Sequence, residues 1–233
     1  MLRPSELWIL AWEQSRDNNP RTTDDAVEEQ FWRERAAGFD EQHPLAPLVD
    51  ELMSSVCASL QRDDHLLEIG SGTGGFTRLL APHVGALTVV EPSASMAEVF
   101  RKNWERTGFR SPVVIQEKWE NTPEIQADVL FGANAFYRIR DMKKALLQMN
   151  AAAKRHVFLL QSVGKPNTKQ VQVSVRGKHY EWERAVLMSG ILFELGILHQ
   201  YRSFQVKRLN GTIHEVALID WEKTSGIKGE GGE

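Results

Sequence analysis

Residues 66–75 read LLEIGSGTGG, and this stretch decides the fold of the chain. The mostly apolar segment from His65 to Ile69 is typical of a short parallel strand that is covered on both faces. Gly70 and Gly72 permit backbone angles closed to other residues, and they let a ligand approach the main chain. The pattern predicts a strand, a glycine turn and a helix over about 74–83, which Thr73 or Ser71 would cap. Such a unit is typical of a pocket for a nucleoside-bearing cofactor.

A second apolar run, LTVVE over residues 87–91, predicts a neighbouring strand that ends in a carboxylate. Glu91 lies 19 positions after Gly72. This is close to the spacing at which an acidic residue meets the ribose hydroxyls in βαβ nucleotide sites. A carboxylate can accept two hydrogen bonds from a cis-diol, so we expect Glu91 to bind a ribose.

The glycines fit two cofactor patterns. Gly70, Gly72 and Gly75 satisfy G-x-G-x-x-G, the dinucleotide fingerprint. Glu68 followed by Gly70, Gly72 and Gly74 satisfies E-x-G-x-G-x-G, which resembles the first motif of class I S-adenosylmethionine (SAM) dependent methyltransferases. We favour SAM, and the dinucleotide and a turn without a ligand remain as alternatives.

The end of the chain strengthens this resemblance. Two strand-like runs, 201–209 and 212–221, flank Asn210–Gly211, which is the strongest short signal for a β-hairpin. The class I methyltransferase fold also ends in an antiparallel hairpin, whereas a plain dinucleotide fold has no such requirement. The resemblance covers about residues 30–221 and is specific for the cofactor, not for the methyl acceptor.

The resemblance implies an α/β, Rossmann-like fold. We expect a central, mostly parallel, seven-stranded sheet with helices on both faces, a C-terminal antiparallel hairpin and extra N-terminal helices. Residues 1–44 would form a helical extension or lid, 45–223 the SAM-binding domain and 224–233 a flexible tail. Within the domain, about 161–183 would be an inserted hairpin or arm for substrate or dimer contacts. A third helix is expected over 45–60.

The family's site residues can be placed on this sequence. Phe39, with Trp32 as second choice, would close over SAM, and Trp119 would stack on the adenine. Glu120 or Glu117 would accept a hydrogen bond from the adenine amine, although the aspartate after glycine that is commoner in the family is missing. The expected cofactor-binding residues are Phe39, Glu68, Gly70, Ser71, Gly72, Thr73, Gly74, Glu91, Pro92, Met96, Trp119, Glu120 and Asn134.

The catalytic residues are less well defined. Asn134 and Tyr137 lie in the loop that lines the substrate entrance in the family, so we expect them nearest the transferred methyl. His179 or Tyr180 are acid–base candidates by position alone. The other histidines are expected at the surface or at caps, and none pairs at metal-ligand spacing, so no metal is expected. The sequence leaves open whether nitrogen, oxygen, sulfur or carbon is methylated.

Composition excludes several classes of protein. The chain is 42% hydrophobic and 25% charged, with a net charge of −3 and no basic stripe with interleaved aromatics, which disfavours a nucleic-acid partner. A single cysteine, Cys57, rules out an intrachain disulfide framework. The sequence contains neither a signal peptide nor an apolar stretch long enough for a bilayer. We therefore expect a cytoplasmic protein with no membrane partner.

The N-terminal sequence predicts two helices. The first, Ser5 to Arg16 with Ser5 as cap, would expose Trp8, Leu10 and Trp12, which hints at a homodimer because exposed apolar faces tend to find a partner. Thr23 would cap the second. The leading function is methylation of a small-molecule acceptor, with S-adenosylhomocysteine (SAH) as product. The alternatives are an RNA- or protein-modifying methyltransferase and a SAM-binding protein without turnover.

Overall fold

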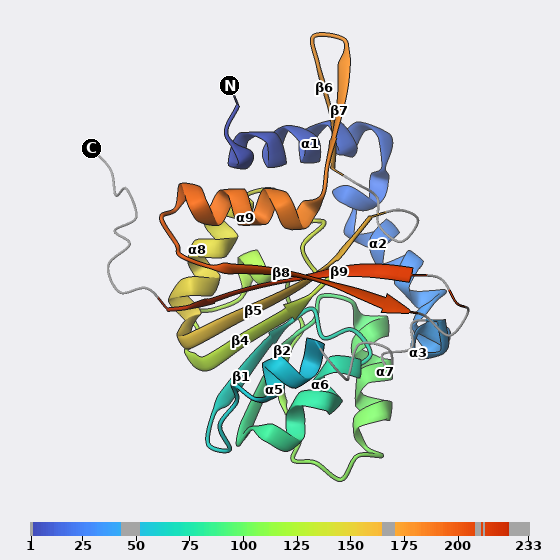
Figure 1. Cartoon of the computed structure of the whole chain (residues 1–233). Helices are drawn as coiled ribbons and strands as arrows, with labels where there is room; N and C mark the ends of the chain where they lie inside the picture. The colour runs from blue at the N-terminus through green and yellow to red at the C-terminus, as the bar shows by residue number, and fades with distance from the viewer. Residues whose placement is uncertain (1, 43–51, 165–170, 208–210, 212, 224–233) are drawn as a thin grey trace.

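The computed structural model describes residues 2–42, 52–164, 171–207, 211 and 213–223. Its centre is a seven-stranded sheet with the order β3-β2-β1-β4-β5-β9-β8 (Figure 1). The strands of this sheet are β1 (His65–Ile69), β2 (Ala86–Val90), β3 (Val113–Ile115), β4 (Ala127–Ala133), β5 (Ala153–Val163), β8 (Gln200–Lys207) and β9 (Ile213–Glu222).

Six strands of this sheet run in one direction, and β9 runs opposite to them between β5 and β8. In register, Ile69 of β1 pairs with Val90 of β2 and with Gly132 of β4. β9 is antiparallel to both β5 and β8, so the C-terminal hairpin enters the sheet with its second strand next to β5. The predicted Rossmann-like fold with a C-terminal antiparallel hairpin is therefore confirmed.

Helices cover both faces of the sheet, which explains why its strands are apolar on both sides. One face carries α1 (Pro4–Asn18), α8 (Met142–Ala152) and α9 (Arg184–Glu194), and the other carries α5 (Ser54–Cys57), α6 (Gly75–Leu80) and α7 (Ala94–Trp104) (Figure 1). Leu66 and Leu67, neighbours on β1, are both fully buried but belong to different core clusters. Short 3-10 turns, η4 (Ala81–His83) and η5 (Trp119–Asn121), connect elements within this frame.

The N-terminal helix packs on its own chain, which corrects the prediction of an exposed aromatic face. Trp8 is only 4% exposed, and its indole Nε1 donates to the carbonyl of Ile139 at 2.7 Å. Trp12 is half-buried and donates to the carbonyl of Arg138 at 2.9 Å. The apolar residues that hinted at a homodimer therefore serve intramolecular contacts.

The caps of the N-terminal helices also differ from expectation. Ser5 lies inside α1, and its hydroxyl donates to Glu194 at 2.7 Å. After η1 (Pro20–Thr22), the cap of α2 (Asp25–Arg33) is Asp24 and not Thr23, since the Asp24 carboxylate accepts from the N–H of Ala26. Two short elements follow, η2 (Ala36–Gly38) and α3 (Phe39–Gln42).

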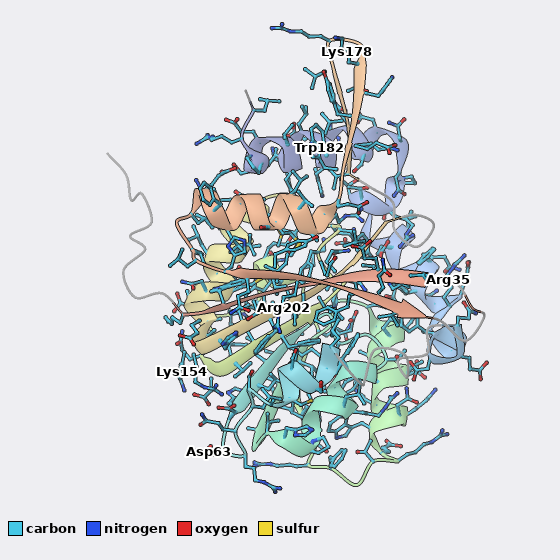
Figure 2. All side chains as sticks on the ribbon, in the orientation of Figure 1. Arg35, Asp63, Lys154, Lys178, Trp182 and Arg202 are labelled. Carbon is cyan, nitrogen blue, oxygen red and sulfur yellow. The ribbon has the colours of Figure 1, made fainter. Side chains whose placement is uncertain are left out.

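The predicted insertion is a separate hairpin of β6 (Val171–Val175) and β7 (Lys178–Trp182). It projects past α1, with Lys178 at its tip (Figures 1 and 2). The amide of Gln14 bonds both the N–H of Ser174 (2.7 Å) and its carbonyl (3.0 Å), so α1 caps the edge of β6. Residues 161–163, expected in the insertion, instead complete β5.

Two predictions fall partly or wholly outside the described residues. The expected helix over 45–60 is described only from residue 52, where it contains α5, and the tail 224–233 is outside the description altogether. Within the described part of the chain, no helix is both long and apolar enough to cross a membrane.

Candidate functional site

A cavity of about 940 Å³ lies at the carboxyl ends of the parallel strands, beneath the N-terminal helices. Its walls come from the glycine turn after β1, the segments after β2, β3 and β4, the ends of β5, β8 and β9, and residues of α1, η1, α2 and α3. The expected site residues that line it are Phe39, Gly70, Ser71, Gly72, Thr73, Glu91, Pro92, Met96, Trp119, Glu120, Asn134 and Tyr137.

The glycine turn forms the floor of the cavity. Gly70 and Gly72 have φ values of 69° and 55°, in the left-handed region that favours glycine. A Cβ on Gly70 would lie 2.3 Å from the Cβ of Ala135, so this glycine allows the loop after β4 to approach β1. A Cβ on Gly72 would meet only the end of Met96, at 3.6 Å, and would otherwise occupy the cavity. Gly72 thus leaves room for a ligand against the backbone.

The two predicted caps of the following helix do not cap it. Gly74 is the N-cap of α6 and has no side chain to contribute, and it does not line the cavity. Thr73 instead donates its hydroxyl to Asp40 of α3. The hydroxyl of Ser71 is buried at the cavity wall and has no hydrogen-bond partner among the described residues.

Asp40 fastens the N-terminal segment to the glycine turn. Its carboxylate accepts from Thr73, from Arg78 of α6 at 3.0 Å and from Asn103 of α7 at 3.2 Å. The preceding residue, Phe39, is thereby held at the cavity, and its ring lies edge-on to Trp32 with centroids 5.8 Å apart. Sequence reasoning selected Phe39 and Trp32 but missed Asp40, whose partners lie more than 30 residues away.

Glu91 lies at the end of β2, where it was expected. Its carboxylate is 6% exposed and accepts from the backbone N–H groups of Gly72 and Ser93, both at 2.8 Å. Burial raises the pKa of Glu91 to about 7, although both backbone hydrogen bonds act in the opposite direction. The carboxylate therefore fixes the glycine turn while it faces the cavity.

Glu68 has a different place from the one implied by the resemblance. It is 1% exposed, does not line the cavity, and accepts from the hydroxyl of Thr77 at 2.5 Å. Burial, assisted by the nearby charge of Glu91, raises the pKa of Glu68 to about 8. Glu68 thus lies beneath the turn and supports it, because it ties β1 to α6.

The segment after β3 forms another part of the wall. Trp119 lines the cavity although it is only 4% exposed, and its Nε1 donates to the carbonyl of Ala145 at 3.4 Å. Glu120 is exposed at the cavity, and Glu117 lines it as well. Lys118 and Arg138 both pair with Asp25 at 2.7 Å, which links this segment to α2.

Asn134 and Tyr137 follow β4, as predicted, but each is directed by a partner. Asn134 has a φ of 54°, and its Oδ1 accepts from the backbone N–H of Ser162 at 2.7 Å and from the amide of Gln161 at 3.2 Å. Tyr137 donates its hydroxyl to Glu28 of α2. Burial, followed by this bond to a carboxylate, raises the pKa of Tyr137, so its hydroxyl stays protonated.

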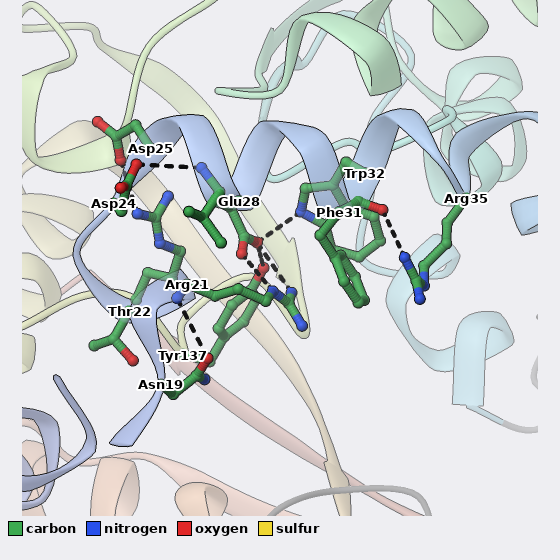
Figure 3. Close-up of polar contacts among 12 residues, drawn as sticks. Asn19, Arg21, Thr22, Asp24, Asp25, Glu28, Phe31, Trp32, Arg35 and Tyr137 are labelled. Atoms are coloured by element: carbon green, nitrogen blue, oxygen red, sulfur yellow. Dashed lines mark hydrogen bonds and ion pairs between the residues drawn. The ribbon is translucent and has the colours of Figure 1, made fainter. Parts of the chain in front are cut away.

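Glu28 gathers donors from several segments at the cavity wall (Figure 3). It accepts from Nε and Nη2 of Arg21 at 2.7 and 3.2 Å, from Nε1 of Trp32 at 2.7 Å, and from Tyr137. Burial alone would raise the pKa of Glu28, but the hydrogen bonds from Arg21 and Tyr137 outweigh it and lower the pKa. The sequence did not point to Glu28 or Arg21.

Two acid–base candidates lie elsewhere. His179 and Tyr180 are exposed on β7 and do not line the cavity, and His179 bonds the hydroxyl of Ser174 at 2.7 Å. The structure therefore does not bring these two candidates to the cavity. His214, expected at the surface, is instead 7% exposed and lines the cavity together with Ser162.

A family model described as a methyltransferase domain matches residues 31–209, which is more than half of the chain. The chain belongs to this family. It contains a methyltransferase domain. Among curated proteins, the methyltransferase is 35% identical over 85 residues to the probable cobalt-precorrin-6B C(15)-methyltransferase (decarboxylating) of Halobacterium salinarum. The match spans 36% of this chain and 44% of that relative, so less than half of the relative's length is compared.

Solved structures share the fold of this methyltransferase. A SAM-dependent methyltransferase from Aquifex aeolicus matches with a TM-score of 0.60 at 15% identity, over 81% of this chain and 98% of that one. A DhpI–SAH complex gives 0.55 at 18% identity, with coverage of 82% and 93%. Magnesium protoporphyrin IX methyltransferase from Synechocystis, with bound SAM, gives 0.54 at 11% identity, with coverage of 91% and 97%.

The residues that line the cavity fit SAM. Gly72 leaves space that a side chain would fill. The buried hydroxyl of Ser71 has no hydrogen-bond partner among the described residues, so it can bond a ligand. Glu91 supplies a carboxylate at the end of β2, which suits a ribose. An aromatic face at Trp119 and the ring of Phe39 add apolar walls.

Proposed function

We propose that this methyltransferase transfers the methyl group of SAM to a small-molecule acceptor by in-line displacement. The observation that carries the proposal is the cavity of about 940 Å³, whose lining extends from the glycine turn to the ends of β5, β8 and β9. The N-terminal helices form one wall of this space, and Asp40 and Glu28 fasten them to the rest of the chain. A cavity of this volume suits a cofactor together with a small-molecule acceptor.

The charge of the chain and the names of similar proteins support the same class of acceptor. The net charge is −3, whereas a nucleic-acid surface would be expected to be basic. The curated relative is named for a precorrin, and one structural neighbour for magnesium protoporphyrin IX; both names give a small molecule as acceptor. Neither name fixes the acceptor of this chain.

We propose that Gly70, Ser71, Gly72, Glu91, Pro92, Met96, Trp119, Glu120, Phe39, Thr73 and Asn134 hold the cofactor, and that Glu68 and Gly74 support the turn from below. When bound, SAM supplies a methyl group made electrophilic by its sulfonium. The task of the protein is then to orient the acceptor and to exclude water. Positioning of that kind contributes on the order of 7–11 kcal/mol. Tyr137 and Asn134 are the side chains that we place beside the reacting groups.

Calorimetric titration with SAM, SAH and NAD tests the cofactor part of this proposal. We expect the wild type to bind SAM and SAH, and not NAD. Glu91→Ala should weaken both adenosyl ligands about 10–100-fold, the effect of losing hydrogen bonds to a charged group. Glu98→Ala is the matched control, because Glu98 is exposed on α7 and lies outside the cavity. NAD binding, or equal losses in the two variants, would refute the site.

The acceptor part needs a separate measurement. A cell extract is divided by ultrafiltration, and each fraction is incubated with the protein and with SAM that carries a labelled methyl group. We expect the label in the small-molecule fraction. Label confined to retained RNA or protein would overturn the small-molecule acceptor and leave the SAM site intact.

A further inference from the structure

The cavity has two ends with different chemistry. At one end lie Gly72 and Glu91, which we assign to the cofactor. At the other end, the last residues of β4 and β5 meet β8 and β9. The wall there alternates between apolar and polar side chains, with Leu160, Val206 and Val216 of the first kind and Asn134, Ser162 and His214 of the second.

Ser162 and His214 form a hydrogen-bonded pair in this second end. The Ser162 hydroxyl lies 2.9 Å from Nε2 of His214, and the two residues are 8% and 7% exposed. β5 and β9 pair so that Ser162 lies opposite Val216, which makes His214 a diagonal neighbour on the same face of the sheet. The backbone N–H of Ser162 also donates to Asn134. The pair is therefore connected to the loop that we place beside the transferred methyl.

A hydroxyl bonded to an imidazole is the arrangement by which proteins move a proton near neutral pH. We propose that Ser162 contacts the acceptor and, with His214 as its positioning residue, takes a proton from it, so that the acceptor is a hydroxyl compound on an apolar, phenol-like frame. This inference rests on the proposed function. The apolar wall suits the frame, and the pair suits one ionisable O–H.

The acceptor oxygen forms a bond to the methyl carbon, and the bond from that carbon to the sulfonium sulfur breaks, with its electron pair left on the sulfur of SAH. The acceptor proton passes to the Ser162 oxygen while the Ser162 proton passes to Nε2 of His214. The proton then leaves the imidazolium to solvent, and no oxidant or reductant is needed.

The chain contains a matched pair outside the cavity. The Ser189 hydroxyl lies 2.7 Å from Nε2 of His199, and both residues are half-buried away from the cavity lining. Changes at this pair test whether any loss is a general effect of breaking a serine–histidine hydrogen bond.

Two probes of different acidity distinguish a proton acceptor from a structural pair. Phenol resembles a tyrosine side chain, with a pKa of about 10, and must lose its proton during transfer. 4-Nitrophenol is already ionised to a large extent near neutral pH. Methyl transfer from labelled SAM to each probe is measured for the wild type, Ser162→Ala, His214→Gln, Ser189→Ala and His199→Gln.

We expect Ser162→Ala and His214→Gln to slow methylation of phenol about 100-fold, which is typical of general-base loss. Transfer to 4-nitrophenol should change little in the same variants. The Ser189→Ala and His199→Gln variants should match the wild type with both probes. An equal loss for the two phenols, or equal losses at the two pairs, would overturn the proton-transfer role.

Binding to the SAH complex provides a second readout that does not depend on turnover. In the wild type, phenol should shift the imidazole proton resonance that is missing from His214→Gln and leave that of His199 in place. No methyl transfer to either phenol, or no shift with either phenol, would overturn the acceptor class. Because SAH binding is measured in every variant, failure of this inference is distinct from failure of the SAM site, which would abolish SAH binding in the wild type.

Discussion

Buried glutamates lie on both sides of the cavity, and their pKa values are shifted in opposite directions on the two sides. Glu68 and Glu91, on the sheet side, are 1% and 6% exposed and are bonded by neutral donors, namely the hydroxyl of Thr77 and two backbone N–H groups. Glu28, on the helix side, is 5% exposed and has the guanidinium of Arg21 as a partner. Burial raises the pKa of Glu68 and of Glu91. At Glu28, the hydrogen bonds from Arg21 and Tyr137 outweigh burial and lower the pKa.

The comparison shows that burial alone does not decide whether a carboxylate is charged. A buried carboxylate with only neutral donors retains its proton to higher pH, whereas a partner cation of fixed charge keeps it ionised. On the helix side, the ionised Glu28 holds η1, α2 and the loop after β4 together. On the sheet side, Glu91 can lose its proton when a ligand that donates hydrogen bonds to it binds.

The largest effect should come from removing the charge on the helix side. Glu28→Ala leaves the guanidinium of Arg21 and two further donors without their acceptor. Breaking such a pair by removing one partner typically costs about 3 kcal/mol or more of the free energy of unfolding. Urea denaturation measures the cost, and Glu34→Ala on the exposed side of the same segment is the control. If the two variants have equal midpoints, Glu28 does not fasten the N-terminal helices.

The next effect is the dependence of stability on pH at Glu68. Its pKa is about 8 in the folded protein and near 4.5 in the unfolded chain, so the folded state binds more protons between these values. The contribution of Glu68 to the free energy of unfolding therefore falls as pH rises from about 4.5 to about 8. Glu68→Gln cannot titrate, and relative to the wild type it should gain at least about 1.4 kcal/mol over this range, the worth of one pKa unit.

This prediction is checked by urea denaturation of both proteins at several pH values. Glu98→Gln, on the exposed surface of α7, should follow the wild type throughout. A difference between wild type and Glu68→Gln that does not grow with pH would show that Glu68 is ionised despite its burial. It would also remove the contrast with Glu28.

The smallest effect is a proton exchange at Glu91. Its pKa is about 7, and hydrogen bonds from ribose hydroxyls would favour the charged carboxylate. We expect SAH binding at neutral pH to release roughly half a proton, measured by calorimetry in buffers of different ionisation enthalpy. The release should vanish above about pH 9, where Glu91 is already ionised. Proton uptake, or release that persists at high pH, would assign the exchange to another group.

The sequence predicted those parts of the site whose residues are close together in the chain. Gly70, Gly72 and Glu91 belong to one βαβ unit, so their spacing alone predicted that they line one cavity. The predicted helix caps Ser5 and Thr73 are wrong for a related reason. Ser5 and Thr73 are good cap residues, but their hydroxyls found carboxylates on distant segments, at Glu194 and Asp40. Local preference is weak, and a tertiary partner overrides it.

The sequence by itself determined the glycine turn and the C-terminal hairpin, because apolar periodicity and turn residues act over a few positions. The seven-stranded sheet followed from the resemblance to a known family. Only the tertiary structure decided which side chains meet. Tyr137 and Glu28 are 109 residues apart, and Ser162 and His214 are 52 apart. No local pattern marks such pairs, since they exist only when the order of the strands brings their ends to one edge of the sheet. The same reason moved Trp8 from an expected surface to the core and His214 from an expected surface to the wall of the cavity.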